Sequence, residues 1–200
     1  MQQGILASCP NAKCTALPVA DGGDGTLSIV SNVSKGKLHK LKVPGPLGQT
    51  VEASWFAMAN KTAVIELAQA SGISHLSKLD AMNSNTFGTG VLIKDAFEKG
   101  YRDFILTVGG SASTDGGTGI LCSLGARFLD QNNNELKPCG SSLIHIGKID
   151  LCLIPKELFN CKFTIACDVE NPLYGPNGAA HIFGPQKGAT YNEVLELDKG

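Results

Sequence analysis

Asp21-Gly22-Gly23-Asp24-Gly25 and Asp115-Gly116-Gly117-Thr118-Gly119 repeat one short pattern, an aspartate followed by three glycines in the next four positions. Each copy follows an apolar run that predicts a strand and precedes a stretch that predicts a helix. Glycine permits positive φ angles and a close approach of the backbone to a ligand. A helix start presents free N–H groups and the positive end of a dipole to an anion. The two stretches therefore predict an α/β protein that handles small anionic or phosphorylated compounds.

The second copy lies in a longer loop that is rich in hydroxyl side chains. Oxygens of a phosphate or carboxylate would find donors there. The candidate binding residues are Gly110, Ser111, Ser113, Thr114, Gly116 and Gly117. Asp115 would repel such an anion unless it binds a substrate hydroxyl or magnesium; alternatively it caps the following helix, worth about 1 kcal/mol. An N-cap does not require two preceding glycines and three hydroxyls, so the functional interpretation is preferred.

In the first copy, Asp21 and Asp24 stand three positions apart around Gly22 and Gly23. If Asp24 lies in the first helical turn, both carboxylates face one space at the strand end. Paired carboxylates suit magnesium, or a base that orients an attacking hydroxyl. A plain glycine turn, with an acid favoured by the helix dipole, is an equally open interpretation. Gly22, Gly23 and Asp24 are therefore candidate ligand-binding residues.

A further predicted strand leads into Asp168. Ligands bind at strand ends in open α/β sheets, and Asp168 and Asn171 are the polar residues best placed at this one. Rigid turn-making alone could explain the glycine- and proline-rich loop that follows. His181, Gln186 and Lys187 could touch a ligand from this loop, although such residues are more often merely exposed.

Length and charge bound the class of protein. Two hundred residues suit one domain or two small ones. A formal net charge of −1 gives no electrostatic reason to expect nucleic acid or an acidic membrane as a partner. No apolar run approaches the roughly 20 residues of a membrane span, and residues 1–10 do not resemble a signal peptide. We expect a cytoplasmic protein without nucleic-acid or membrane partners, and a homo-oligomer is left open.

The seven cysteines form neither a C-x-x-C motif nor a cysteine–histidine cluster with zinc spacing. Several, Cys122 and Cys167 in particular, lie in apolar stretches, where a free thiol behaves as a small hydrophobe. Reduced cysteines that fill the core are the expectation.

Apolar and turn patterns predict the order of the elements. Strands are expected over residues 14–20, 37–43, 50–58, 62–67, 103–108, 127–130 and 162–167, and helices over 26–33, 89–99, 120–125 and from about 190. Short turns join the strands of residues 37–67 into an antiparallel β unit. The later alternation of strand and helix predicts a parallel sheet. The fold class is α/β, with a parallel-sheet core and a β-rich appended or inserted segment.

Two common nucleotide-binding motifs are absent. No G-x-x-x-x-G-K-[ST] occurs, which excludes a P-loop NTPase. Neither glycine loop reads G-x-G-x-x-G, which weakens a dinucleotide interpretation.

Several motifs occur together in one order along nearly the whole chain. They are Pro-Val-Ala-Asp-Gly-Gly-Asp-Gly-Thr at 18–26, Gly-Pro-Leu-Gly at 45–48, Glu-Leu-Ala-Gln-Ala-Ser-Gly at 66–72, Phe-Gly-Thr-Gly at 87–90, residues 110–119, Cys-Asp-Val-Glu-Asn-Pro-Leu at 167–173 and Gln-Lys-Gly-Ala at 186–189. In content and order these motifs resemble the bacterial-type glycerate kinase family.

The resemblance implies ATP-dependent phosphorylation of D-glycerate, with the 2-hydroxyl favoured as acceptor, and with Mg²⁺. By analogy, the residues that line the site are Asp21, Asp24, Ser111, Thr114, Asp115, Asp168 and Asn171. Phosphoryl transfer requires mainly positioning and charge neutralisation. Asp115 is the preferred residue to orient the glycerate hydroxyl, and Asp21 and Asp168 are further catalytic candidates. Asp24 and Asp168 are candidate metal ligands.

The resemblance also implies two α/β domains with the substrates between them. It predicts a partial first domain over residues 1–45 and a second over residues 46–200, with a β-rich start and an incomplete C-terminus. Family members begin with a further strand and continue for roughly as long again, which predicts a truncated fragment. An inactive fragment, or a domain that binds a hydroxy acid or nucleotide without turnover, is one alternative. Another enzyme of phosphorylated metabolites, such as a phosphatase or isomerase, is a second.

Overall fold

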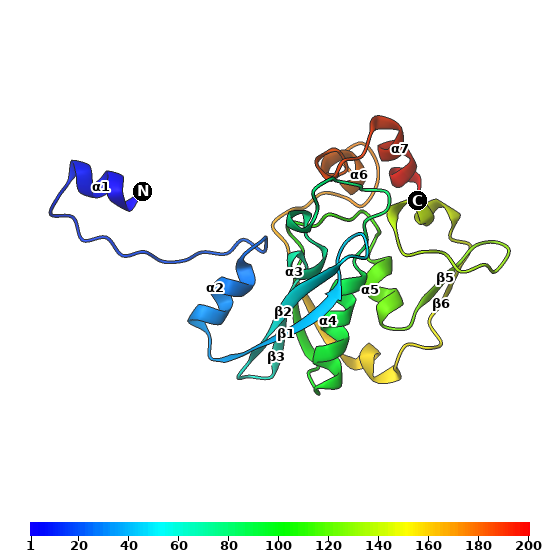
Figure 1. Ribbon diagram of the computed structural model, residues 1–200, viewed down its shortest axis with the longest axis horizontal. Helices are drawn as coiled ribbons and strands as arrows, with labels where there is room; N and C mark the ends of the chain where they lie inside the picture. Colours follow the sequence, from blue (N-terminus) through cyan, green and yellow to red (C-terminus); the bar gives the residue numbers. More distant parts are fainter.

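The computed structural model describes residues 1–200 and is built around one five-stranded sheet (Figure 1). Its strands lie in the order β1-β2-β3-β4-β7. They are β1 Gly36–Pro44, β2 Thr50–Met58, β3 Thr62–Glu66, β4 Asp103–Thr107 and β7 Lys162–Ala166. The sheet and the helices packed on it confirm the α/β class.

The sheet is antiparallel on one side and parallel on the other. β1 pairs with β2 and β2 with β3 antiparallel, as tight turns between consecutive strands require. β3, β4 and β7 pair in parallel, with helices in the connections between them. The β-rich segment predicted as an appendage is therefore the antiparallel half of the same sheet. The outer edge of β7 carries no neighbouring strand.

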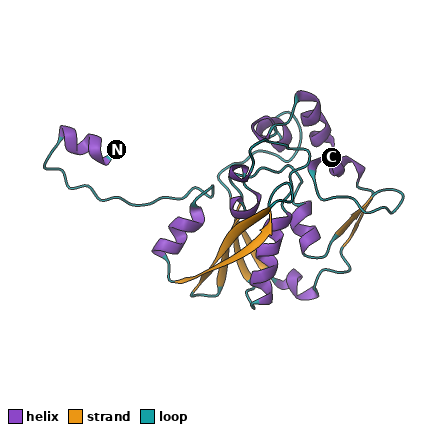
Figure 2. Ribbon diagram, in the orientation of Figure 1, coloured by secondary structure: helices purple, strands orange, loops and turns teal.

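Side chains alternate across the sheet and so supply two cores. Trp55, Ile65 and Phe104 face one side, where they pack with Leu92 and Ile93 of α4 (Phe87–Glu98) in the main core. The other side carries Phe56 and Val64, which pack with Leu27 of α2 (Thr26–Val33) in a smaller core. Helices therefore cover both faces of the sheet (Figure 2), as βαβ connections require.

Most of the remaining elements lie around the carboxyl edge of the parallel strands or on the side of α5, whereas η3 lies at the amino end of β7 (Figure 1). They are α3 Ala68–Ser71, η1 Ile73–His75, α5 Thr118–Ser123, the two-stranded sheet of β5 Arg127–Leu129 and β6 Lys148–Asp150, η2 Gly140–His145, η3 Lys156–Asn160, α6 Ala179–Phe183, η4 Pro185–Lys187 and α7 Tyr191–Lys199. A capping box of Thr190 and Glu193 starts α7. Much of the chain outside the sheet is thus irregular and positioned by short helices.

The N-terminal segment extends away from this body (Figure 1). It begins with α1 (Gln2–Ser8), in which no residue is buried. The predicted strand over residues 14–20 is wrong: this stretch has no assigned secondary structure, and Leu17 and Val19 are exposed. A strand is stabilised by hydrogen bonds to a neighbour, and this stretch pairs with no strand of the chain.

All seven cysteines are free, as expected, but only Cys139 is buried. The prediction that they fill the core therefore fails for most of them. Cys122 is half-buried, and burial raises the pKa of its thiol to about 11. This thiol is protonated at neutral pH and is a poor nucleophile.

The predicted domain boundary at residue 45 falls between β1 and β2, which pair along their whole length in one sheet. The division into two domains stays a prediction. No helix of the structure is long and apolar enough to cross a bilayer.

Close packing of α4 on α5 gives a first prediction. Gly90→Ala should destabilise the chain by about 1–3 kcal/mol. An added Cβ would lie 1.9 Å from Ser123 Oγ and 2.7 Å from the Ile120 carbonyl oxygen. Urea unfolding followed by circular dichroism measures the effect. Gly4→Ala is the control, because a Cβ there meets nothing within 4 Å; equal stability of both variants would contradict tight α4–α5 packing.

Candidate functional site

The two glycine loops meet at the carboxyl edge of the parallel strands. The Gly109 amide donates to the Gly22 carbonyl over 3.1 Å. A Cβ on Gly109 would lie 2.5 Å from Gly23 Cα, and one on Gly22 would lie 2.9 Å from the Ala166 carbonyl oxygen. Gly22 also has a φ of +88°, which favours glycine. These glycines therefore allow backbone to pack on backbone, so their role does not require a ligand.

The start of α2 is capped from within the protein by Glu66, the last residue of β3. Its carboxylate is fully buried and accepts hydrogen bonds from the amides of Gly25, at 3.1 Å, and Leu27, at 2.6 Å. Gln69 Nε2 donates a further bond at 3.2 Å. Glu66 was not among the predicted site residues. Its signal in the sequence is one acid at the end of an otherwise apolar strand.

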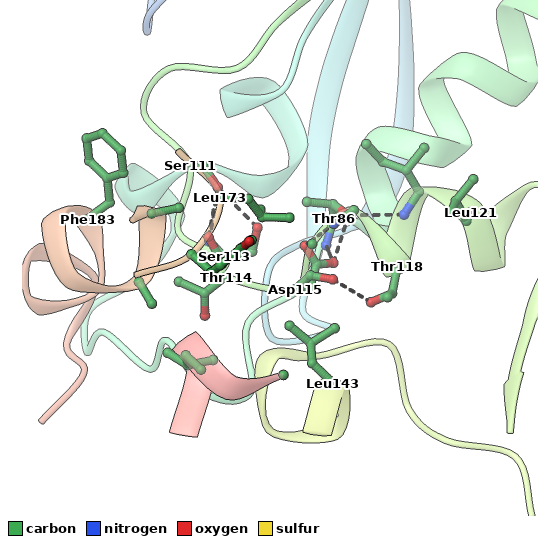
Figure 3. Close-up of a pocket in the computed structure, with 18 of the residues that line it drawn as sticks. Thr86, Ser111, Ser113, Thr114, Asp115, Thr118, Leu121, Leu143, Leu173 and Phe183 are labelled. Carbon is green, nitrogen blue, oxygen red and sulfur yellow. Dashed lines mark hydrogen bonds between the residues drawn. The ribbon is translucent and has the colours of Figure 1, made fainter. Parts of the chain in front are cut away.

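Asp115 performs the same task for two helices at once (Figure 3). Its Oδ2 accepts from the Thr86 amide and hydroxyl, both at 2.8 Å, and from the Gly119 amide at 3.0 Å. Its Oδ1 accepts from the Gly117 amide at 3.2 Å. Thr86 is the N-cap of α4 and Gly117 that of α5, so one buried carboxylate joins both helix starts.

These bonds change the interpretation of the Asp-Gly pattern. The N–H groups expected to receive an anion at both helix starts already face protein carboxylates. The hydrogen bonds of Asp115 support the capping role that the sequence left open for this residue. A role for Asp115 at the reacting atoms stays a prediction.

A cavity of about 830 Å³ opens beside this loop, here called the lysine cavity. Its polar lining comes from Thr86, Ser111, Ser113, Thr114, Asp115, Thr118, Tyr174, Lys187, Asp198 and Lys199, and its apolar walls include Leu106, Val108, Ile120, Leu121, Leu143, Leu173 and Phe183. Figure 3 shows part of this lining around Asp115. Ligand cavities typically combine apolar walls with a few polar groups in this way.

Lys187 supplies the cationic group closest to the hydroxyl loop. Its ammonium donates to the Ser113 carbonyl oxygen. Burial lowers the pKa of Lys187 to about 8, and the charge of Asp115 opposes this shift. A lysine that retains its proton here would attract a carboxylate or phosphate strongly, because the cavity screens charge less than water does. The sequence named Lys187 but could not place it beside residues more than 70 positions away.

The hydroxyls of the loop have defined partners. Ser111 Oγ and Ser113 Oγ lie 3.1 Å apart, and Thr114 Oγ1 donates to the Ala81 carbonyl oxygen at 2.7 Å. Gly110 has a φ of +72° and Gly116 one of +58°, which shapes the turns on either side. The structure therefore brings Ser111, Ser113 and Thr114 together with Lys187 in one cavity.

The other predicted residues lie outside the lysine cavity. Asp21 is exposed, and its Oδ1 accepts from the Gly23 amide at 2.9 Å. Asp24 and Asp168 are exposed. Asn171 Nδ2 donates to the Asn177 carbonyl oxygen at 3.2 Å. A single cleft lined by all the predicted residues stays a prediction.

The structure contains no metal site made of protein ligands alone, which Mg²⁺ bound to substrate phosphates does not require. No group of three or more His, Cys, Asp and Glu side chains is placed to hold a metal ion. The residues present do not form a protein cage for Mg²⁺, and ligation by Asp24 and Asp168 stays a prediction.

A sheet with parallel strands, glycine loops at its carboxyl edge and a cavity lined by hydroxyls and a lysine defines an α/β protein with a candidate small-molecule site. The sequence model of the glycerate kinase family matches residues 1–200. The chain belongs to this family.

Named relatives and a solved structure agree. A glycerate kinase of Halalkalibacterium halodurans is 41% identical over 203 residues, covering 100% of this chain and 53% of the relative. A glycerate 2-kinase of Escherichia coli is 42% identical over 201 residues, covering 99% and 53%. A crystal structure from Salmonella typhimurium LT2, named as a candidate glycerate kinase 2, superposes with a TM-score of 0.86 at 38% identity, covering 98% and 54%. The chain thus spans about half the length of these relatives.

The buried carboxylate of Asp115 gives a second prediction. Asp115→Asn should destabilise the chain by about 2–4 kcal/mol, because an amide donor would replace one acceptor among four N–H and O–H donors. Asp24→Asn, at an exposed carboxylate in the other loop, is the control and should leave stability unchanged. Urea unfolding measures the stability of both variants. An Asp115→Asn variant as stable as the wild type would refute the capping role.

Lys187 gives a third prediction. Since its folded pKa is lowered, the unfolded chain binds more protons between pH 8 and 10.5, and stability should rise with pH there. Lys187→Met should therefore be more stable than the wild type at pH 7 by about 1–3 kcal/mol. The difference should shrink as the pH approaches 10. Thermal unfolding across this range measures it, and a difference that does not change with pH would contradict the burial of a charged ammonium.

Proposed function

We propose that this chain carries the acceptor part of a site that transfers the γ-phosphoryl group of ATP to D-glycerate, with 2-phosphoglycerate as the favoured product. The observation that carries the proposal is the Lys187 ammonium beside the Ser111–Ser113 hydroxyls in the lysine cavity. The names of the relatives support glycerate as the substrate.

In this proposal, Lys187 receives the carboxylate of glycerate or the transferred phosphoryl group. The bond from the γ-phosphorus to the bridging oxygen of ATP breaks as the bond to the glycerate 2-oxygen forms, and the hydroxyl proton leaves to a base. An ammonium held at the place where negative charge gathers lowers the barrier without reorganising during the reaction. Ser111 and Ser113 would donate or accept hydrogen bonds that orient the acceptor.

The aspartates divide into two kinds. Asp115 is proposed as a positioning residue, because its oxygens hold the starts of α4 and α5. Asp21 and Asp168 stay the candidates for the base, and Asp24 and Asp168 those for Mg²⁺, since all three are exposed at loops after predicted or observed strands. Magnesium, when bound, would neutralise charge on the phosphates of ATP.

A domain that binds glycerate without turnover is the second candidate. The observation that favours it is coverage of about half of each relative. In that case the lysine cavity would bind D-glycerate, and no phosphoglycerate would form from ATP.

Lys187→Met tests the proposal. It should weaken D-glycerate binding at pH 7 by about 10-fold or more, the usual effect of losing a hydrogen bond to a charged group. Wild-type affinity should fall as the pH rises through about 8, where Lys187 loses its proton. Calorimetry measures binding, and phosphorus NMR with ATP and Mg²⁺ identifies any phosphoglycerate.

Lys162→Met is the matched control. Lys162 is exposed at the amino end of β7, away from the carboxyl edge of the sheet, and does not line the lysine cavity. Its affinity for D-glycerate should equal that of the wild type. Equal binding by Lys187→Met and Lys162→Met would overturn the proposed site. Binding without product would favour the second candidate.

A further inference from the structure

A second cavity, of about 530 Å³, lies on the other face of the sheet, between α2 and strands β3, β4 and β7. Its walls are apolar and include Val30, Met58, Val64, Ile105 and Ala166. Thr26 and Thr107 are two of its polar lining residues, so it is here called the threonine cavity.

Both threonines present an unsatisfied hydroxyl. Thr26 is 7% exposed and Thr107 is 1% exposed, and neither Oγ1 has a hydrogen-bond partner. Along β4, Thr107 alternates with Leu106 of the main core, so its side chain points to the same face as Ile105. Buried polar side chains in native proteins almost always have partners. Two orphan hydroxyls in one cavity therefore point to a bound group that completes them.

The charge of the lining restricts what this group is. No lysine, arginine or histidine lines the threonine cavity, so nothing there would neutralise a phosphate. Its single carboxylate is Asp21, whose Oδ2 has no hydrogen bond in the structure. Apolar walls suit a flat ring, hydroxyls suit ring nitrogens and amino groups, and a free carboxylate oxygen suits a sugar hydroxyl.

The position of the cavity connects it to the lysine cavity. Gly22 lines the threonine cavity, and its carbonyl oxygen accepts a hydrogen bond from the Gly109 amide. The loop that contains Gly109 continues to Ser111, which lines the lysine cavity. The two cavities thus flank the paired glycine loops at one edge of the sheet. A molecule seated in the threonine cavity could extend charged groups along these loops.

We propose that the threonine cavity binds the nucleoside part of the phosphoryl donor. The purine ring packs between α2 and the sheet, the hydroxyls of Thr26 and Thr107 bond to its polar edge, and Asp21 accepts from the ribose. A donor bound in this way makes Asp21 a nucleoside ligand and leaves Asp168 as the candidate base. The choice of a nucleoside rests on the proposed function, whereas the orphan hydroxyls stand independently of it.

Adenosine, which has no phosphate, is the probe, and calorimetry on the 200-residue chain is the measurement. Adenosine should bind the wild type, and Thr107→Val, which replaces the hydroxyl by a methyl group of similar size, should weaken binding about 10-fold or more. Ribose alone should not bind. Should Thr107→Val fail to fold, Thr26→Val makes the same test from the other wall.

Ser84→Ala is the matched control. Ser84 is fully buried and its hydroxyl also lacks a partner, but it does not line the threonine cavity. It should leave adenosine affinity unchanged. A stabilised Thr107→Val that binds adenosine like the wild type would show that the hydroxyl is only a packing defect, and would overturn the proposal.

The failure of this inference and of the proposed function are distinguishable. No adenosine binding, with D-glycerate still bound through Lys187, overturns the nucleoside site alone. Threonine-dependent adenosine binding, with D-glycerate affinity insensitive to Lys187→Met, supports the nucleoside site and overturns the proposed acceptor site.

Discussion

The bonds of the buried Asp115 carboxylate to the starts of α4 and α5 are the interaction on which the carboxyl edge of the sheet depends. Both helices cover the main core or its border, and both begin at this one side chain. Glu66 does the same for α2 on the opposite face. Buried carboxylates are tolerated only with full complements of donors, so these two acids fix where three helices begin.

At the carboxyl edge of the sheet, the residues that shape the backbone differ from those that line the lysine cavity with charge. The glycines let three backbone segments touch, and the helix starts are occupied by protein carboxylates. The ammonium that contacts the hydroxyl loop is that of Lys187, in the short helix η4 far along the chain. The two cavities lie on opposite faces of the sheet, with the paired glycine loops between them.

Local patterns predicted the local structure well. The helix over 26–33 and the strand over 50–58 form with the predicted bounds, because periodicity and turns specify them. The strand over 14–20 does not form, because pairing depends on a neighbour that periodicity cannot reveal. The strand-and-helix pattern around the glycine loops placed them at the ends of strands and the starts of helices, whereas the capping by Glu66 and the contact of Lys187 with Ser113 arise only from tertiary packing.

The free outer edge of β7 has a consequence for the behaviour of the chain in solution. Its main-chain N–H and C=O groups on that side have no strand to bond, and Phe163 and Ile165 are 40% and 52% exposed. Neither proline nor a bulge protects it, and a single lysine opens the strand. Such an edge is a template for β-strand addition and aggregation. A second copy of the chain and any other extended segment would therefore compete for the same row of main-chain groups on β7.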